Sequence, residues 1–263
     1  MTTVQRGLGS LIHGRTTVML AVLLTGWTSA QPLAYAQTNQ YVQAAYDGTV
    51  GDAKVGMSLA LNGNTVTRGH YFYYRYLKDI ALTGTQSGSN VTLHEAGGTF
   101  NLHFVGNGSN GDKPLDFPNS VGLAGTWTDG SKTLPVKLSG GGDQSTVDTP
   151  PGPRYGDITS ESDAAFEARA QGFYFAALKG DPKAAARFVH FPLRVNWGST
   201  RHELIRSPKQ LADNWSRIFT PKYLAALRDA APHDMPVMKS EYAMLGAGWV
   251  YFGDKGAEVI NVP

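Results

Sequence analysis

Hydrophobic and polar residues alternate along the chain from about residue 41 to residue 138. The run from Val55 to Leu61 places a hydrophobic residue at every second position, and Asn62-Gly63-Asn64 follows it as a turn. Asn and Gly suit a tight turn because they tolerate positive φ. A longer strand is predicted from Thr65 to Leu77. Successive strands with turns between them predict an all-β antiparallel meander of about eight strands over residues 41–138, which forms a small barrel or a bent sheet.

After about residue 160 the hydrophobic period changes from two to 3.6. One helix is predicted from Ser162 to Lys179, and Gly180 ends it. Three further helix starts combine an N-cap residue with proline at the first helical position: Asp181-Pro182, Ser207-Pro208 and Thr220-Pro221. Strands are predicted at Phe191–Trp197, His202–Ile205, Val237–Leu245, Trp249–Phe252 and Ala257–Val262. Residues 161–263 therefore read as an α+β domain.

Residues 139–160 are rich in glycine, proline and small polar residues. Such a composition offers little to pack against a core. We therefore predict a flexible linker over 139–160, between the β domain and the α+β domain.

The first 36 residues have the layout of a secretory signal peptide. Basic residues precede the apolar run Val18 to Leu24, and Ala34-Tyr35-Ala36 fits the A-x-A cleavage pattern, with Thr28-Ser29-Ala30 as a second option. The apolar run is shorter than a membrane span requires. We expect a bacterial protein that is periplasmic or secreted, and that is not inserted in a membrane after cleavage.

Charge and cysteine content exclude several classes of partner and cofactor. Removal of residues 1–36 takes away Arg6 and Arg15 but no acid, and so balances the 23 basic and 21 acidic residues of the whole chain. The mature chain therefore lacks the excess of basic residues that nucleic-acid binding requires. The absence of cysteine excludes disulfides, thiolate metal sites and a cysteine nucleophile. We predict no cofactor, and the sequence does not fix the oligomeric state.

Two sequence features that could bind a dinucleotide or a metal lack the structural context that such binding requires. Gly106 to Gly111 matches G-x-G-x-x-G, but no helix follows it to hold a pyrophosphate. His70, His94 and His103 are of the residue type that binds metal. Strand alternation turns His94 and His103 outward, so we predict no metal site.

Residues 70–76, HYFYYRY, form the most unusual string of the chain. Tyr71, Tyr73 and Arg75 share one strand face, whereas His70, Phe72, Tyr74 and Tyr76 share the other. One face is expected in a core. The other face is either packed against the rest of the chain or forms a binding strip of the residue types that anchor interfaces and stack on sugars. Tyr71, Tyr73 and Arg75 are the candidate binding residues.

The order of elements over about 165–263 resembles the NTF2-like superfamily. The resemblance rests on Leu178 to Asp181, Phe191 to Val195, Ser207 to Phe219, and the closing strands around Trp249 to Phe252 and Val259 to Asn261. It implies a sheet curved around helices into a cone with a pocket. That superfamily includes isomerases, dehydratases, transport factors and binding domains, so the fold alone does not settle the function. The N-terminal half resembles small β-domains of exported bacterial proteins, a likeness that implies no activity.

Polar and aromatic residues are predicted to line the mouth and wall of such a cone. They are His190, Arg194, Asn196, Trp197, Tyr242 and Trp249. No catalytic constellation is recognisable, so we predict a binding module for an envelope glycan, a protein or a small molecule. One alternative is a pocket enzyme, an isomerase or hydrolase acting on a small apolar substrate, with Glu241 or Glu258 as its acid. The other is a structural or assembly factor of the cell envelope.

Overall fold

The computed structural model describes residues 41–263 with the exception of 110, 112, 148–151 and 199. The described residues belong to one compact unit, Thr38–Pro263. The predicted signal peptide over 1–36 and both of its cleavage sites lie outside the described residues. Across the described ranges, no helix has both the length and the apolar character that a membrane crossing requires.

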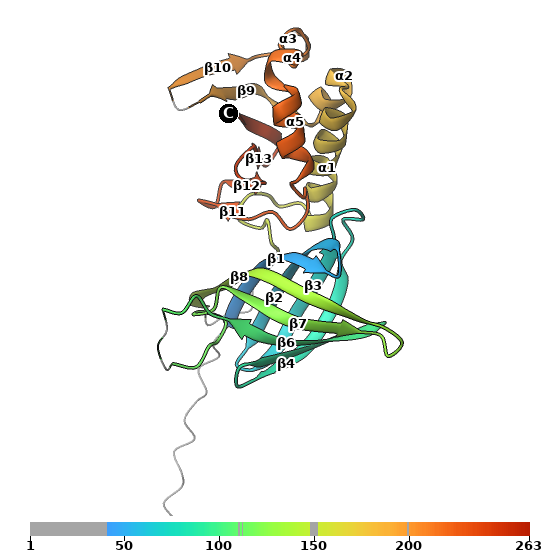
Figure 1. Cartoon of the computed structure of the whole chain (residues 1–263). Helices are drawn as coiled ribbons and strands as arrows, with labels where there is room; N and C mark the ends of the chain where they lie inside the picture. The colour runs from blue at the N-terminus through green and yellow to red at the C-terminus, as the bar shows by residue number, and fades with distance from the viewer. Residues whose placement is uncertain (1–40, 110, 112, 148–151, 199) are drawn as a thin grey trace, which may run out of the picture. The chain divides into compact units, whose positions relative to one another are not determined.

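The N-terminal part is a closed antiparallel barrel of eight strands in chain order (Figure 1). The strands are β1 (Tyr41–Val50), β2 (Ala53–Asn62), β3 (Thr65–Tyr73), β4 (Ile80–Ser87), β5 (Asn90–Glu95), β6 (Gly98–Val105), β7 (Gly122–Thr128) and β8 (Thr133–Val147). The predicted antiparallel meander is confirmed, and pairing of β8 with β1 closes it. The predicted turn also forms, because Gly63 and Asn64 join β2 to β3 and Gly63 adopts a φ of 56°.

Strand alternation fills the barrel with apolar side chains. Met57, Leu93 and Phe100 are almost fully buried in this core, together with Tyr71. The predicted strand from Thr65 to Leu77 is shorter than expected, because β3 ends at Tyr73 and residues 74–76 form a turn. The burial of Tyr71 and the end of β3 at Tyr73 determine which side chains of residues 70–76 are accessible.

The linker predicted over 139–160 is corrected at its beginning and at its end. Residues 139–147 continue β8 and pair with β1. Gly140 pairs with Tyr46, and a Cβ at Gly140 would lie 2.1 Å from the carbonyl oxygen of Ala45. The glycines therefore allow close approach of two strands, which composition alone does not distinguish from flexibility. Tyr155 is completely buried in the core of the C-terminal part. Residues 148–151 lie outside the described residues.

The C-terminal part combines helices with a six-stranded sheet. Its helices are α1 (Asp163–Lys179), α2 (Pro182–Ala185), the 3-10 helix Ala186–Phe188, α3 (Pro208–Asp213), α4 (Trp215–Ile218) and α5 (Pro221–Arg228). Its strands are β9 (Val189–Trp197), β10 (Arg201–Ile205), β11 (Val237–Met238), β12 (Tyr242–Leu245), β13 (Val250–Gly253) and β14 (Gly256–Val262). The predicted α+β composition is confirmed.

Side-chain capping explains where the helices begin. At each of four starts the capping oxygen accepts a hydrogen bond from the backbone N–H three residues later; the caps are Ser162, Asp181, Ser207 and Thr220. The three predicted cap-proline starts are therefore confirmed. Gly180 ends α1 in the left-handed conformation, with a φ of 69°.

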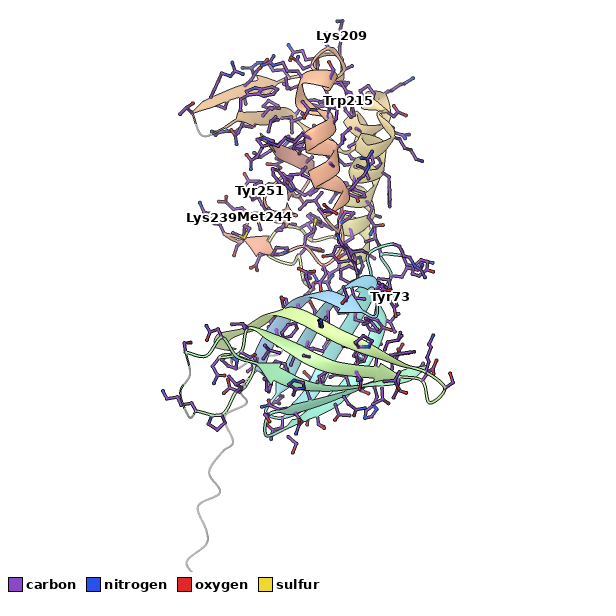
Figure 2. All side chains as sticks on the ribbon, in the orientation of Figure 1. Tyr73, Lys209, Trp215, Lys239, Met244 and Tyr251 are labelled. Atoms are coloured by element: carbon purple, nitrogen blue, oxygen red, sulfur yellow. The ribbon has the colours of Figure 1, made fainter. Side chains whose placement is uncertain are left out.

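The second sheet has the strand order β10-β9-β14-β13-β12-β11, with β14 parallel to β9. The strand predicted over Val237–Leu245 is instead a tight hairpin, because Lys239 and Ser240 turn with positive φ between β11 and β12. Figure 1 shows α1 and α5 along one face of this sheet. Leu193 and Val195 point to that face and are fully buried with Phe173 in the same core. Figure 2 adds the side chains to this view, with Trp215 on α4 and Tyr251 on β13 among those it labels.

Candidate functional site

Six ionisable side chains from distant parts of the chain meet where the barrel contacts the C-terminal part. His70 comes from β3 and Asp79 from the segment between β3 and β4. Arg154 and Glu167 lie before and on α1, and His233 and Asp234 lie between α5 and β11. These six residues, His70, Asp79, Arg154, Glu167, His233 and Asp234, are called the charge cluster below.

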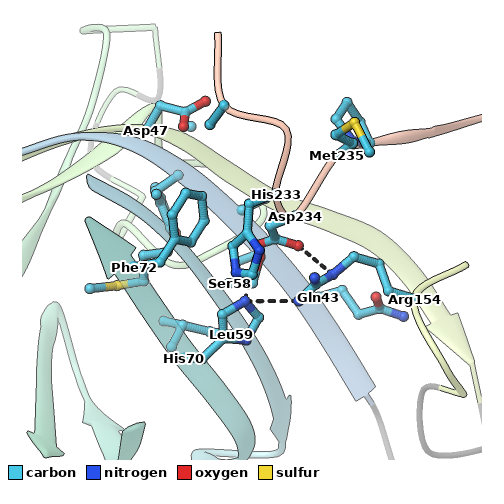
Figure 3. A pocket seen from close by; sticks show the side chains of 18 of the residues that line it. Gln43, Asp47, Ser58, Leu59, His70, Phe72, Arg154, His233, Asp234 and Met235 are labelled. Carbon is cyan, nitrogen blue, oxygen red and sulfur yellow. Dashed lines mark hydrogen bonds and ion pairs between the residues drawn. The ribbon is translucent and has the colours of Figure 1, made fainter. Parts of the chain in front are cut away.

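Arg154 is the centre of the charge cluster. Its Nη1 lies 2.7 Å from Oε1 of Glu167, and its Nε lies 2.5 Å from Oδ1 of Asp234. Its Nη2 lies 2.8 Å from Nε2 of His70, which itself lies 3.2 Å from Oδ2 of Asp234. The planar guanidinium is suited to several partners at once. One side chain from the segment predicted as a linker thus contacts the barrel, α1 and the loop before β11. Figure 3 shows its contacts with His70 and Asp234.

His233 lies between two carboxylates. Its Nε2 is 2.7 Å from Oδ1 of Asp79, and its Nδ1 is 2.5 Å from Oε2 of Glu167. Burial opposes the positive charge, but the hydrogen bonds to Asp79 and Glu167 outweigh it and raise the pKa of His233 to about 9. His233 is therefore protonated at neutral pH and cannot accept a proton as a general base.

The loop before β11 is held in place by backbone as well as side-chain contacts. Asp234 adopts a φ of 51°, a conformation that Asp tolerates better than most residues. Its N–H donates to Oε1 of Glu167 at 2.9 Å, and the N–H of Met235 donates to the hydroxyl of Tyr155 at 2.9 Å. Burial opposes ionisation of Asp234, but a hydrogen bond from His70 and the charge of Arg154 lower its pKa. The hydroxyl of Ser58 on β2 also donates to Asp234.

Phe72 couples the barrel wall to His233. The two rings meet edge to face, with centroids 4.4 Å apart, and Phe72 is buried. Phe72 has room because its neighbour across the β2–β3 pair is Gly56: a Cβ there would lie 2.5 Å from the Phe72 ring. Gly56 and Phe72 thus set how closely His233 approaches the barrel.

We expect Gly56→Ala to destabilise the protein by about 1–3 kcal/mol, because Phe72 has to leave its packed position. Urea unfolding followed by tryptophan fluorescence measures the change. Gly97→Ala is the matched control, since a Cβ at Gly97 meets nothing within 4 Å. Equal stability of the two variants would contradict the role given to Phe72.

Beside the charge cluster lies a cavity of about 1500 Å³. Its wall carries small residues from the barrel, among them Ala45, Ser58 and Gly141, together with the rings of Phe72 and Tyr74. Six aspartates line it, against two arginines and two histidines: Asp47, Asp79, Asp157, Asp163, Asp229, Asp234, Arg68, Arg154, His70 and His233. Even with His233 protonated, the lining has an excess of negative charge. Such a cavity attracts a positively charged molecule.

The structure places the candidate strip Tyr71, Tyr73 and Arg75 away from this cavity. Tyr71 is buried inside the barrel, where its hydroxyl donates to Glu95 at 2.9 Å, and Tyr73 packs edge to face on it. Arg75 lies in the turn after β3, with its guanidinium over the ring of Tyr76. The binding strip assigned to Tyr71 and Tyr73 is corrected, because their face is the inner one. The opposite face, with His70, meets the C-terminal part.

Of the six candidate residues of the C-terminal part, Arg194 and Asn196 contact each other on β9, and the others contact different partners. Three of them make polar contacts: His190 Nδ1 lies 3.0 Å from Oε1 of Glu258, and Arg194 donates to Asn196, which donates to Asn261. Arg194 lies on the sheet face opposite the buried Leu193 and Val195. Each of the three aromatic residues has its own partner: Trp197 contacts Arg217, Tyr242 contacts Tyr251, and Trp249 contacts Tyr223. None of these six lines the cavity beside the charge cluster.

Sequence reasoning does not assign a function to any member of the charge cluster. The helical spacing does indicate that Glu167 is buried. It lies three residues before Ala170 and seven before Tyr174, which are both buried on the same helix. His233 and Asp234 stand between Pro232 and Pro236, a short turn with two ionisable residues. Arg154 belongs to the segment interpreted as a linker. The sequence raises His70 only as a metal ligand; among the described residues no group of three or more potential ligands can hold a metal ion.

Comparisons with known proteins add no relationship to this geometry. No protein-family model matches the sequence, and no curated protein or solved structure shows significant similarity to it. The proposed function therefore rests on the geometry and charge of the site.

Proposed function

We propose that this protein is a binding protein whose acidic cavity takes a small molecule bearing a positive charge. The observation that carries the proposal is the excess of aspartates in a cavity of about 1500 Å³ that also offers aromatic rings. Amino groups complement carboxylates, and the rings of Phe72 and Tyr74 supply an apolar or cation–π surface. An amine or an amino sugar from the cell envelope carries both the amino group and the apolar carbon surface that such a cavity would bind.

The protonation states of the charge cluster favour binding over catalysis. His233 is a cation held by two acids, and the hydroxyl of Ser58 donates to Asp234 instead of to a histidine. The buried hydroxyl of Tyr155 donates to Glu167, and burial together with the Glu167 charge raises the pKa of Tyr155. None of these groups is poised as a nucleophile or base. The charge cluster instead supports a fixed cavity wall.

The remaining parts of the proposal concern fold family and location. We place the C-terminal part in the NTF2-like superfamily on its order of elements, and we assign residues 1–36 as a signal peptide that directs the protein to the periplasm or beyond. An envelope location would bring the cavity into contact with glycans that carry amino groups. The pocket enzyme and the assembly factor are the alternative functions.

Isothermal titration of the purified full chain with spermidine, glucosamine, glucose and glutamate tests the cavity. We expect the two cationic probes to bind and the neutral and anionic ones not to bind. The double variant Asp47→Asn, Asp157→Asn should weaken cation binding about thirtyfold, because the two removed charges contribute about 1 kcal/mol each near the ligand. The hydroxyls of Tyr74 and Ser240, which donate to these carboxylates, keep an acceptor.

Asp213→Asn is the control, since Asp213 pairs with Lys209 on the exposed α3 and does not line the cavity. Retained binding in the control and lost binding in the double variant support the proposal. Equal binding of glucose and glucosamine, or unchanged cation affinity in the double variant, would refute it.

A further inference from the structure

A second, smaller cavity has the opposite charge. Its volume is about 290 Å³, and it lies between the barrel and the ends of two helices, α1 and α5. Lys54 of β2, Arg75 of the turn after β3 and Arg228 of α5 contribute basic side chains to its lining. Tyr174, Phe175 and Leu178 of α1 contribute the apolar side.

The three cations are weakly engaged within the protein. Lys54 pairs with Asp229 at 3.1 Å, but the two side chains are 57% and 77% exposed, so the pair is worth little. Arg75 rests on the ring of Tyr76. Arg228 forms no ion pair with any residue that the structure describes, although the negative end of the α5 dipole lies beside it and offsets part of its charge. Positive charge is therefore available to a ligand.

The apolar side of this cavity includes an exposed aromatic ring, that of Phe175. Phe175 is 46% exposed on α1, and its ring meets that of Tyr174 edge to face with centroids 5.2 Å apart. An exposed ring beside these cations offers the two kinds of contact that an aromatic anion needs. The volume is close to the lower limit for small-molecule sites.

We propose that this cavity binds a small aromatic molecule that carries a carboxylate or a phosphate. The guanidinium groups of Arg75 and Arg228 would hold the anionic group through paired N–H donors. The ring of the ligand would lie on Phe175. This site is separate from the proposed acidic cavity, although Tyr74 lines both.

Isothermal titration of the purified full chain with benzoate, phenyl phosphate, inorganic phosphate and benzyl alcohol tests the proposal. Benzoate and phenyl phosphate should bind, the tighter of them identifying the preferred anionic group, and benzyl alcohol should bind at least tenfold more weakly. The double variant Arg75→Gln, Arg228→Gln should weaken both aromatic anions at least tenfold. Phe175→Ala should weaken the aromatic anions and leave any binding of inorganic phosphate unchanged.

Arg187→Gln is the matched control, because Arg187 is an exposed arginine that rests on Phe188 outside the cavity. Arg75 and Arg228 are also exposed, so their variants should melt like the parent protein. The double variant should keep its affinity for spermidine, which separates this site from the acidic cavity. Equal affinity for benzyl alcohol and benzoate, or unchanged affinity for both aromatic anions in the double variant, would overturn the proposal.

Discussion

Arg154→Ala is expected to lower the free energy of unfolding by about 3–5 kcal/mol, because it removes a largely buried cation that pairs with two carboxylates. The guanidinium is 20% exposed, and its partners Glu167 and Asp234 are 7% and 12% exposed. Its removal takes the guanidinium away from buried Asp234 and leaves buried Glu167 with His233 as its remaining cationic partner. Because Arg154 also contacts His70 of the barrel, the loss should be accompanied by separation of the barrel from the C-terminal part.

Urea unfolding measures the stability of this variant, and limited proteolysis follows the separation of the two parts. Arg217→Ala is the control: Arg217 pairs with Glu203, but these side chains are 47% and 39% exposed, so its loss should cost about 1 kcal/mol. An Arg154 variant as stable and as protease-resistant as the Arg217 variant would show that the charge cluster does not hold the barrel in place.

Raising the pH from 6 to 9 should cost about 3 kcal/mol of stability through His233. The pKa of this histidine rises from 6.5, its ordinary value, to about 9 in the folded protein, where burial opposes the charge but the hydrogen bonds to Asp79 and Glu167 prevail. A raised pKa means that the contribution is fully present below pH 6.5 and is lost as the pH rises through 9. Each pKa unit corresponds to about 1.4 kcal/mol.

Unfolding in urea at several pH values between 6 and 9 measures this slope. His233→Gln should be less stable at pH 6 and should lose most of the pH dependence. The control His190→Gln should keep it, because His190 is 42% exposed beside Glu258. Buried tyrosines such as Tyr155 also have raised pKa values, but their contribution is lost only from about pH 10 upward. A parent protein whose stability is flat between pH 6 and 9 would contradict the protonated state of His233.

On the acid side the sign reverses. Burial opposes ionisation of Asp79 and Asp234, yet the neighbouring histidines and the charge of Arg154 lower the pKa of both carboxyl groups. A lowered pKa gives a contribution that is present above the ordinary value of 3.8 and is lost as the pH falls below it. The charge cluster is thus most stable between the acid range and about pH 7.

The sequence by itself determined those features that depend on neighbouring residues. Alternation determined the β strands, and Gly63 determined the turn between β2 and β3. Cap-proline pairs such as Ser207-Pro208 determined the helix starts, because a cap is satisfied within one turn of helix. Local hydrogen bonding and side-chain periodicity are sufficient for each of these.

Tertiary structure alone decided the inner face of β3 and the composition of the site. Alternation separates Tyr71 from His70, but only barrel closure shows which of them faces inward. Gly140 reads as part of a linker until its partner strand is known, because only then is it clear that a Cβ there would meet the backbone of β1. Arg154 and His233 are 79 residues apart in the chain, and Glu167 contacts both of them. Charge pairing across such separations depends on packing, and packing leaves no periodic trace in the sequence.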